Sequence, residues 1–232
     1  MASGRKFRTR VGQFFLFGNV ALVGCLTFDL FSDASLHFLR PFDDGMHLWV
    51  TTHVPQASRD FLFDKALSDV GIVSVLVSWF LVDGAESEAP DFLAELRHRL
   101  RPSNLKLGAA VLGVEALASV AKDVFRRPRP RLDFESFSFP SGHTLAAVTL
   151  GGMFLFFRLY PFLKRRRLGQ TLPEWLPLRW TLLGGWLVIG GMTAVGRIGA
   201  DAHWLSDTLA AGAIGASTVT AVWLMTRKTD AA

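Results

Sequence analysis

The chain has 232 residues, of which 50% are hydrophobic and only 19% are charged. This composition excludes intrinsic disorder, which combines low hydrophobicity with high charge. A single cysteine, Cys25, excludes an intrachain disulfide scaffold. The net charge of +5 and a pI near 9.9 raise the question of nucleic-acid binding, which the positions of the basic residues decide.

Six apolar stretches dominate the sequence. A helix needs about 20 mostly apolar residues to cross a hydrocarbon core about 30 Å thick. No strand-like alternation accompanies these stretches. The sequence therefore predicts an all-α, polytopic membrane protein, a six-transmembrane-helix bundle that forms one domain over residues 1–232. The predicted spans lie near residues 12–31, 66–84, 105–121, 143–162, 180–196 and 203–226.

The distribution of Lys and Arg predicts the orientation of the bundle, because these residues favour cytoplasmic loops. With a cytoplasmic N-terminus, fifteen of the 25 Lys and Arg lie inside and nine outside. One outside segment, 122–142, breaks the rule. Guanidinium groups at a membrane surface can bind phosphate through paired, charge-assisted hydrogen bonds. A basic run alone would fit a lipid headgroup or nucleic acid, but its location between apolar spans points to a membrane. The basic residues of this segment are Lys122, Arg126, Arg127, Arg129 and Arg131.

The same segment ends in Pro140-Ser141-Gly142-His143, which opens the fourth span. Ser141 is a natural N-cap, and Gly142 allows a ligand to approach the backbone closely. The free N–H groups at this helix start, with the positive end of the helix dipole, form an anion site. His143 is expected in the first turn, facing the bound anion.

A further group of polar residues lies between the fifth and sixth spans, where Arg197 precedes His203 and Asp207. Residues four apart share one face of a helix. The carboxylate can therefore fix the tautomer of the imidazole and leave its other nitrogen free as a nucleophile or base. A His-x-x-x-Asp pattern alone is weak evidence. Its location on the predicted membrane face of His143 and the cations makes it a candidate catalytic site.

These residues together resemble the signature of the type 2 phosphatidic acid phosphatase superfamily, the integral-membrane lipid phosphate phosphatases. The three parts of that signature match Lys122 with Arg129-Pro130, then Pro140 to His143, and then Arg197, His203 and Asp207. All three lie within residues 122–207, and the resemblance extends from the third predicted span to the end of the sixth. Gly196 departs from the pattern, because the family has Ser there.

The resemblance implies a phosphatase domain that needs no metal and no cofactor. His203, oriented by Asp207, would attack phosphorus and form a phosphohistidine, and His143 would protonate the leaving oxygen. The expected partner is a membrane lipid that bears a phosphate or diphosphate: phosphatidate, phosphatidylglycerol phosphate, undecaprenyl diphosphate or a lipid A phosphate. The active site would face the periplasm from a bacterial inner membrane, or the non-cytoplasmic side of an organelle membrane. The phosphate-binding residues would be Lys122, Arg129, Ser141, Gly142 and Arg197.

The remaining polar residues receive simpler interpretations. Glu115 lies seven residues before Lys122 on the same helix face, either as a functional carboxylate or in a hydrogen bond within the bundle. Residues 43–65 are expected to form an amphipathic helix on the outer surface. Acidic residues at the outer end of the second span, Asp64 and Asp69, are expected to be interfacial. Four further histidines lack metal-ligand spacing, which argues against a zinc site, and they are expected on loops as solvated or interfacial residues: His37, His47, His53 and His98.

Two other classes of protein remain as alternatives. A vanadium-haloperoxidase-like oxidoreductase shares this type of anion site, but such enzymes are soluble and the apolar spans argue against one. A catalytically silent membrane protein could use the basic residues to bind or transport anionic lipid. That protein would not need both His143 and His203 together with Asp207.

Overall fold

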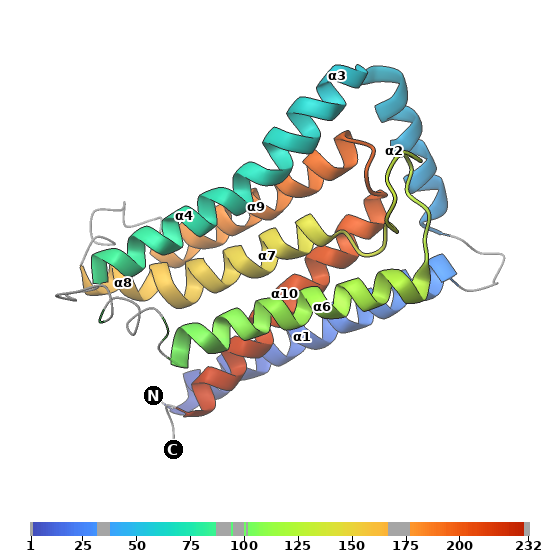
Figure 1. The fold of residues 1–232 in the computed structure, drawn as a ribbon. Helices are drawn as coiled ribbons and strands as arrows, with labels where there is room; N and C mark the ends of the chain where they lie inside the picture. The colour runs from blue at the N-terminus through green and yellow to red at the C-terminus, as the bar shows by residue number, and fades with distance from the viewer. Residues whose placement is uncertain are drawn as a thin grey trace.

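The computed structural model describes residues 2–31, 38–86, 94, 100, 102–166 and 177–229, and within these ranges it contains helices and loops but no strand. Long helices lie roughly side by side in one bundle (Figure 1), which confirms the predicted all-α class. The long helices are α1 (Ala2–Phe31), α4 (Ser68–Glu86), α6 (Pro102–Phe125), α7 (Gly142–Phe154), α9 (Leu178–Gly199) and α10 (Leu205–Thr229). The shorter elements are α2 (Arg40–His53), α3 (Gln56–Ser58), α8 (Tyr160–Arg165) and two π-helices, η1 (Arg59–Leu67) and η2 (Leu155–Leu159).

Five helical segments of the described chain are long and apolar enough to cross a membrane, which confirms the prediction of a polytopic membrane protein. They are Gly12–Phe31, Gln56–Ala85, Gly142–Arg165, Leu178–Gly199 and Leu205–Thr226. The remaining predicted span, 105–121, lies within α6. This helix has 24 residues and packs against α7 and α10, although Lys106, Glu115 and Lys122 reduce its mean hydropathy.

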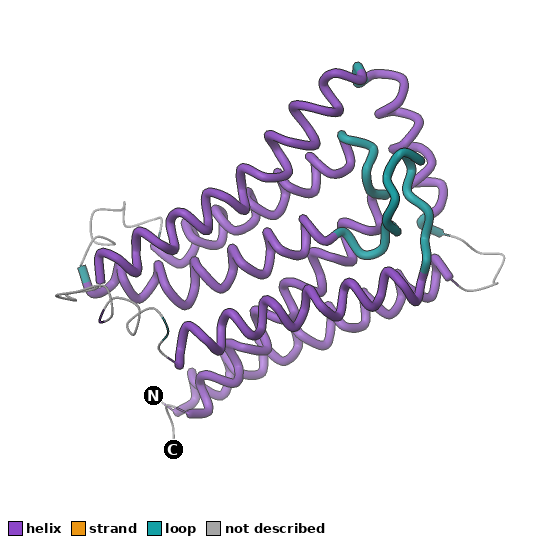
Figure 2. Tube along the Cα trace, in the orientation of Figure 1, coloured by secondary structure: helices purple, strands orange, loops and turns teal. Residues whose placement is uncertain are grey.

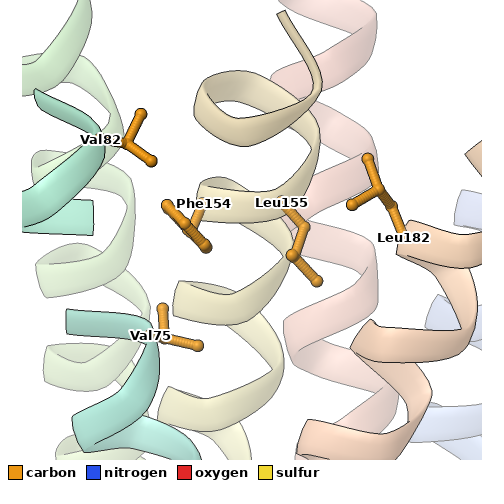
Figure 3. Packing of buried hydrophobic residues seen from close by; sticks show 5 residues of the cluster. All are labelled: Val75, Val82, Phe154, Leu155 and Leu182. Atoms are coloured by element: carbon orange, nitrogen blue, oxygen red, sulfur yellow. The ribbon is translucent and has the colours of Figure 1, made fainter. Parts of the chain in front are cut away.

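Helix α7 occupies the centre of the bundle, where it contacts α4, α6, α9 and α10. Small residues permit this close packing: a Cβ atom on Gly152 would lie only 2.6 Å from a methyl carbon of Val219 on α10. At the C-terminal end of α7, Phe154 belongs to an apolar cluster with residues of α4, η2 and α9 (Figure 3). Because α7 is packed on all these helices, its N-terminus lies among them at the other end of the bundle.

The predicted amphipathic helix over residues 43–65 is wrong in its second half. Helix α2 ends at His53, and residues 56–65 belong instead to α3 and η1, which continue directly into α4. Pro55 explains the break, because proline disfavours helical backbone at the residue before it and lacks an N–H group. Helix α2 lies across one end of the bundle and contacts α9 and α10 there (Figure 1).

Candidate active site

The sequence-predicted site residues meet at the end of the bundle that α2 covers. Helices α6 and α9 end there, and α7 and α10 begin there. The two loops of this end, 126–141 and 200–204, lie close together (Figure 2), and the N–H of Arg131 donates to the carbonyl of Asp201 at 3.1 Å. Residues from four helices and two loops are thus brought to one place.

His203 is buried, with 2% of its surface exposed, and its Nε2 atom lies 3.1 Å from Nη1 of Arg129. A guanidinium can only donate, so Nε2 must accept and the proton of the neutral ring is on Nδ1. Burial lowers the pKa of His203 to about 4; Asp207 opposes this shift, and Arg129 and Arg197 reinforce it. The ring is therefore neutral at pH 7, with an unprotonated nitrogen facing a cation.

The other ring nitrogen of His203 faces Asp207. Its Nδ1 is 3.6 Å from Oδ2 of Asp207, which is longer than a hydrogen bond. Oδ2 accepts instead from the backbone N–H of Trp204 at 3.0 Å. The expected His–Asp pair is therefore adjacent but not hydrogen-bonded, and a movement of about 0.5 Å would close it.

A tight turn after α9 connects His203 with Arg197. Asp201 has a φ of 57°, the left-handed conformation that commonly ends helices. The N–H groups of Ala202 and His203 both donate to the carbonyl of Arg197, at 3.1 and 3.3 Å. The backbone thus keeps Arg197 and His203 in one compact unit.

Arg129 is held by its own loop and by the turn after α9. Its Nε and Nη2 atoms donate to the carbonyl and hydroxyl of Ser136, each at 2.7 Å, and Nη1 donates to the carbonyl of Ala202 at 2.8 Å. Burial lowers the pKa of Arg129 to about 10, so the side chain remains charged at neutral pH. A buried cation therefore lies directly beside His203.

The start of α7 differs from the prediction in one respect. Ser141 occupies the N-cap position, but its hydroxyl is paired with that of Thr144 at 3.1 Å and makes no capping bond. Its N–H donates to the carbonyl of Asp207 at 3.3 Å, so that N–H group is unavailable to a ligand. The first bond within the helix runs from Leu145 to Ser141. The three preceding N–H groups, of Gly142, His143 and Thr144, have no partner within the helix, as is usual at the start of a helix.

Lys122 and Glu115 of α6 lie beside this helix start. A Cβ atom on Gly142 would be 3.6 Å from Nζ of Lys122 and 4.0 Å from Oε2 of Glu115. Glycine therefore keeps the backbone accessible next to the ammonium group. Oε1 of Glu115 is buried and finds no hydrogen-bond partner among the described residues, which gives no support to the predicted bond within the bundle.

Asp207 is held in place by Arg127, which the sequence analysis names only as part of the basic cluster, and through it by Asp43, which the sequence analysis missed. Nη1 of Arg127 donates to Oδ1 of Asp207 at 2.5 Å, and Nη2 donates to Oδ2 of Asp43 on α2 at 2.7 Å. Asp43 also accepts the N–H of Ser206 at 2.9 Å. Both carboxylates are almost fully buried. The sequence signal that was available is charge balance, because a buried cluster of cations requires nearby carboxylates.

Asp64 and Asp69, which were expected to be interfacial, also contact the site. Asp64 of η1 accepts a hydrogen bond from Nη1 of Arg197, and Oδ1 of Asp69 lies 3.4 Å from Nε2 of His143. On an α-helix, residues five apart point about 140° away from each other. In a π-helix, hydrogen bonds join residues five apart, so two such residues lie about one turn from each other and on nearly the same side. The π-helical winding of η1, which ends at Leu67, therefore brings Asp64 nearer to the face of Asp69 than an α-helix would.

Close packing of η1 on α9 explains the glycine at position 196. A Cβ atom there would lie 2.8 Å from the backbone nitrogen of Ser68 and 2.9 Å from the carbonyl oxygen of Phe63. A Cβ atom on Gly199 would overlap the ring of Phe63. The hydroxyl of Ser68, which donates to Phe63 at 2.8 Å, occupies the space that a serine at 196 would need.

The remaining histidines differ from one another. His47 lies on α2 rather than on a loop, so that part of its prediction is wrong, and its Nδ1 atom is 2.7 Å from Oδ1 of Asp201. His53 is exposed, as expected. The other two, His37 and His98, lie outside the described residues. Across the described ranges, no group of three or more His, Cys, Asp or Glu side chains is placed to hold a metal ion.

The apolar helices define an integral-membrane protein, and one end of its bundle gathers a buried imidazole, three cations and the start of α7. The family model described as the PAP2 superfamily matches residues 103–230, more than half of the chain. The chain therefore belongs to the PAP2 superfamily, as the sequence motifs indicated.

The fold has a counterpart among solved structures. The crystal structure of the first transmembrane PAP2 type phosphatidylglycerolphosphate phosphatase from Bacillus subtilis superposes with a TM-score of 0.68. The match covers 93% of this chain and 97% of the other, at 16% sequence identity, and shows a shared fold. A search of curated proteins finds no match.

Proposed function

We infer that this protein is an integral-membrane lipid phosphate phosphatase that acts through a phosphohistidine and without a metal ion. The observation that carries this proposal is the contact between Arg129 and Nε2 of His203. It supports a neutral imidazole whose lone pair is directed into a cationic site, as a nucleophile toward phosphorus requires. The chain from residue 1 to 232 would act as one membrane-embedded domain, since Asp43 and Asp64 reach the site from outside the matched residues.

The phosphate would be held by charges and helix N–H groups. Lys122, Arg129 and Arg197 would neutralise the non-bridging oxygens, and the N–H groups at the start of α7 would donate to them. The N–H of Gly142 is better suited to this role than that of Ser141, which is already bonded. Phosphoryl transfer depends mainly on positioning and charge stabilisation, and these groups supply both.

The reaction would proceed in two displacements. In the first, Nε2 of His203 forms a bond to phosphorus while the bond to the leaving oxygen breaks, and His143 gives that oxygen a proton. Asp207 would accept a hydrogen bond from Nδ1 and stabilise the positive charge that develops on the ring. In the second, water attacks phosphorus, the bond between phosphorus and Nε2 of His203 breaks, and His143 takes the proton of the water. Phosphate is released and neutral His203 is restored.

The substrate would be a lipid whose phosphate or diphosphate lies at the level of the headgroups. The side chains of His143 and Asp69 are 45% and 51% exposed at the end of the bundle, which supports access from that level. The excess of Lys and Arg on the opposite side favours a periplasmic or other non-cytoplasmic site. The fold shared with a phosphatidylglycerolphosphate phosphatase makes that lipid the first substrate to test.

The test is phosphate release in detergent from phosphatidate, phosphatidylglycerol phosphate, undecaprenyl diphosphate and a lipid A phosphate. The wild type should release phosphate from at least one of them, and His203→Ala should reduce turnover by about 1,000-fold or more. His53→Ala, which changes an exposed histidine of α2, is the matched control and should retain activity.

Trapping of the intermediate tests the mechanism separately. Brief incubation with a lipid labelled with ³²P on its phosphate should label the wild type but not His203→Ala, and acid should remove the label. Binding of lipid without turnover by the wild type would instead favour an anionic-lipid binding protein. Turnover retained by His203→Ala would exclude His203 as the nucleophile.

A further inference from the structure

Asp69 provides His143 with a carboxylate partner from a part of the chain that the family model does not cover. It lies in the first turn of α4, and its Oδ1 atom is 3.4 Å from Nε2 of His143 in the first turn of α7. The matched residues begin at 103. The two imidazoles of the site therefore each face an aspartate, Asp207 for His203 and Asp69 for His143.

The position of Asp69 is fixed by its neighbours in the sequence. The preceding residue, Ser68, is fully buried, and its hydroxyl donates to the carbonyl of Phe63 at 2.8 Å. Its backbone nitrogen lies against Gly196, where a Cβ atom would be only 2.8 Å away. Asp69 therefore extends from a backbone that is packed directly on α9, although its own side chain is half exposed.

The charges around His143 give this carboxylate a specific effect. Besides Asp69 of α4, the charged groups that act on the ring are Asp64 of η1, Arg197 of α9 and Lys122 of α6. Both cations are also the groups expected to hold the phosphate. Without Asp69, the ring would face two cations and one carboxylate that already accepts a hydrogen bond from Arg197.

A general acid must carry its proton and direct it at the leaving oxygen. A carboxylate at one ring nitrogen favours the protonated ring and fixes its rotation, so that the other nitrogen faces the site. We propose that Asp69 is a positioning residue for His143: it holds the ring at Nε2 and leaves Nδ1 to donate to the leaving group. This inference rests on the proposed phosphatase function.

Leaving-group chemistry distinguishes this role from a merely structural one. An alcohol leaves from phosphorus only with help from an acid, whereas a nitrophenolate leaves without a proton. The experiment compares Asp69→Asn with wild type on a short-chain phosphatidate and on a nitrophenyl phosphate that carries an alkyl chain, both in the same micelles. We compare kcat/KM, which reports the first displacement and not the later hydrolysis of the phosphohistidine. The value for phosphatidate should fall about tenfold or more, and that for the aryl ester should stay within about twofold.

Two control variants complete the comparison. Asp69→Glu keeps the carboxylate and should recover much of the activity on phosphatidate. Asp44→Asn removes an exposed carboxylate of α2, which pairs with Arg40 at 3.9 Å, and should change neither substrate. Because each variant is assayed on both substrates, the ratio of the two rates does not depend on how much protein is folded.

The outcomes separate this inference from the proposed function. If the wild type releases phosphate but Asp69→Asn slows both substrates equally, or slows neither, only the role of Asp69 is overturned. The same conclusion would follow if Asp69→Glu were no better than Asp69→Asn. Failure of the wild type to release phosphate from either ester and from every lipid of the panel above would overturn the phosphatase assignment and this inference with it.

Discussion

The buried position of His203 predicts that the enzyme remains active well into the acidic range. Desolvation lowers the pKa of this ring from its ordinary 6.5 to about 4. That difference corresponds to about 3 kcal/mol by which the site disfavours the imidazolium. At pH 5.5 about 97% of the rings are neutral, compared with about 9% for an unperturbed histidine. The acid limb of kcat/KM, which follows the free enzyme, should therefore lie near pH 4.

The assay is kcat/KM for phosphate release between pH 4 and 8, with the ionisation of the substrate phosphate measured by ³¹P NMR and divided out. In parallel, protein labelled with ¹³C-histidine gives the titration of the His203 ring directly, and His203→Gln identifies its signal. Both methods should report protonation only below about pH 5. An acid limb between pH 6 and 7, matched by an NMR titration in the same range, would refute the reasoning from burial.

Three further outcomes follow from the packing and charges of the site. Gly199→Ala should lower the melting temperature in detergent, because a Cβ atom there meets the ring of Phe63, and overpacking costs about 1–3 kcal/mol. Gly191→Ala on the same helix meets nothing within 4 Å and should not lower it; equal effects would contradict the steric account. Arg127→Gln should destabilise the protein by about 3–5 kcal/mol and abolish phosphate release, whereas Arg126→Gln, at an exposed position, should do neither. Orthovanadate should compete with substrate and EDTA should leave turnover intact; loss of activity in EDTA that an added metal restores would reveal a metal site.

The helices could be predicted because a membrane imposes a simple length requirement. A stretch such as 180–196 cannot leave its backbone unpaired in lipid, so about 20 apolar residues predict a helix with little ambiguity. The prediction was less secure where charges enter a helix, as with Lys106 and Glu115 in α6. The prediction of one amphipathic helix failed at residues 56–65, because the mixture of apolar and polar residues continues past the break at Pro55.

The candidate site was predictable where its residues fall in recognisable spacings. Motifs placed Lys122, Arg129, His143 and His203 together, and the structure brings them to one end of the bundle; their catalytic roles remain predictions. Ser141 shows the limit of such reasoning. Its residue type fits an N-cap, but Thr144 and Asp207 compete for its hydroxyl and N–H, and no local pattern encodes that competition.

Unlike Asp207, which lies four residues after His203, the carboxylates Asp43 and Asp64 could not be located from spacing. Asp43 lies more than 80 residues before Arg127, and Asp64 lies 133 residues before Arg197. Only the folded arrangement of α2, η1 and α9 brings these charges together. The need for them was nevertheless implicit, because buried guanidinium groups require compensating negative charge.

The π-helical turn in η1 has a consequence for how the chain tolerates a change of length. An α-helix that lacked one residue between Asp64 and Asp69 would carry these two carboxylates four positions apart, again on a single face. Two proteins that differ by one residue here could thus present the same acidic pair to the same histidine and arginine. A one-residue gap at this point of an alignment would mark a change from π-helical to α-helical winding rather than the loss of a functional residue.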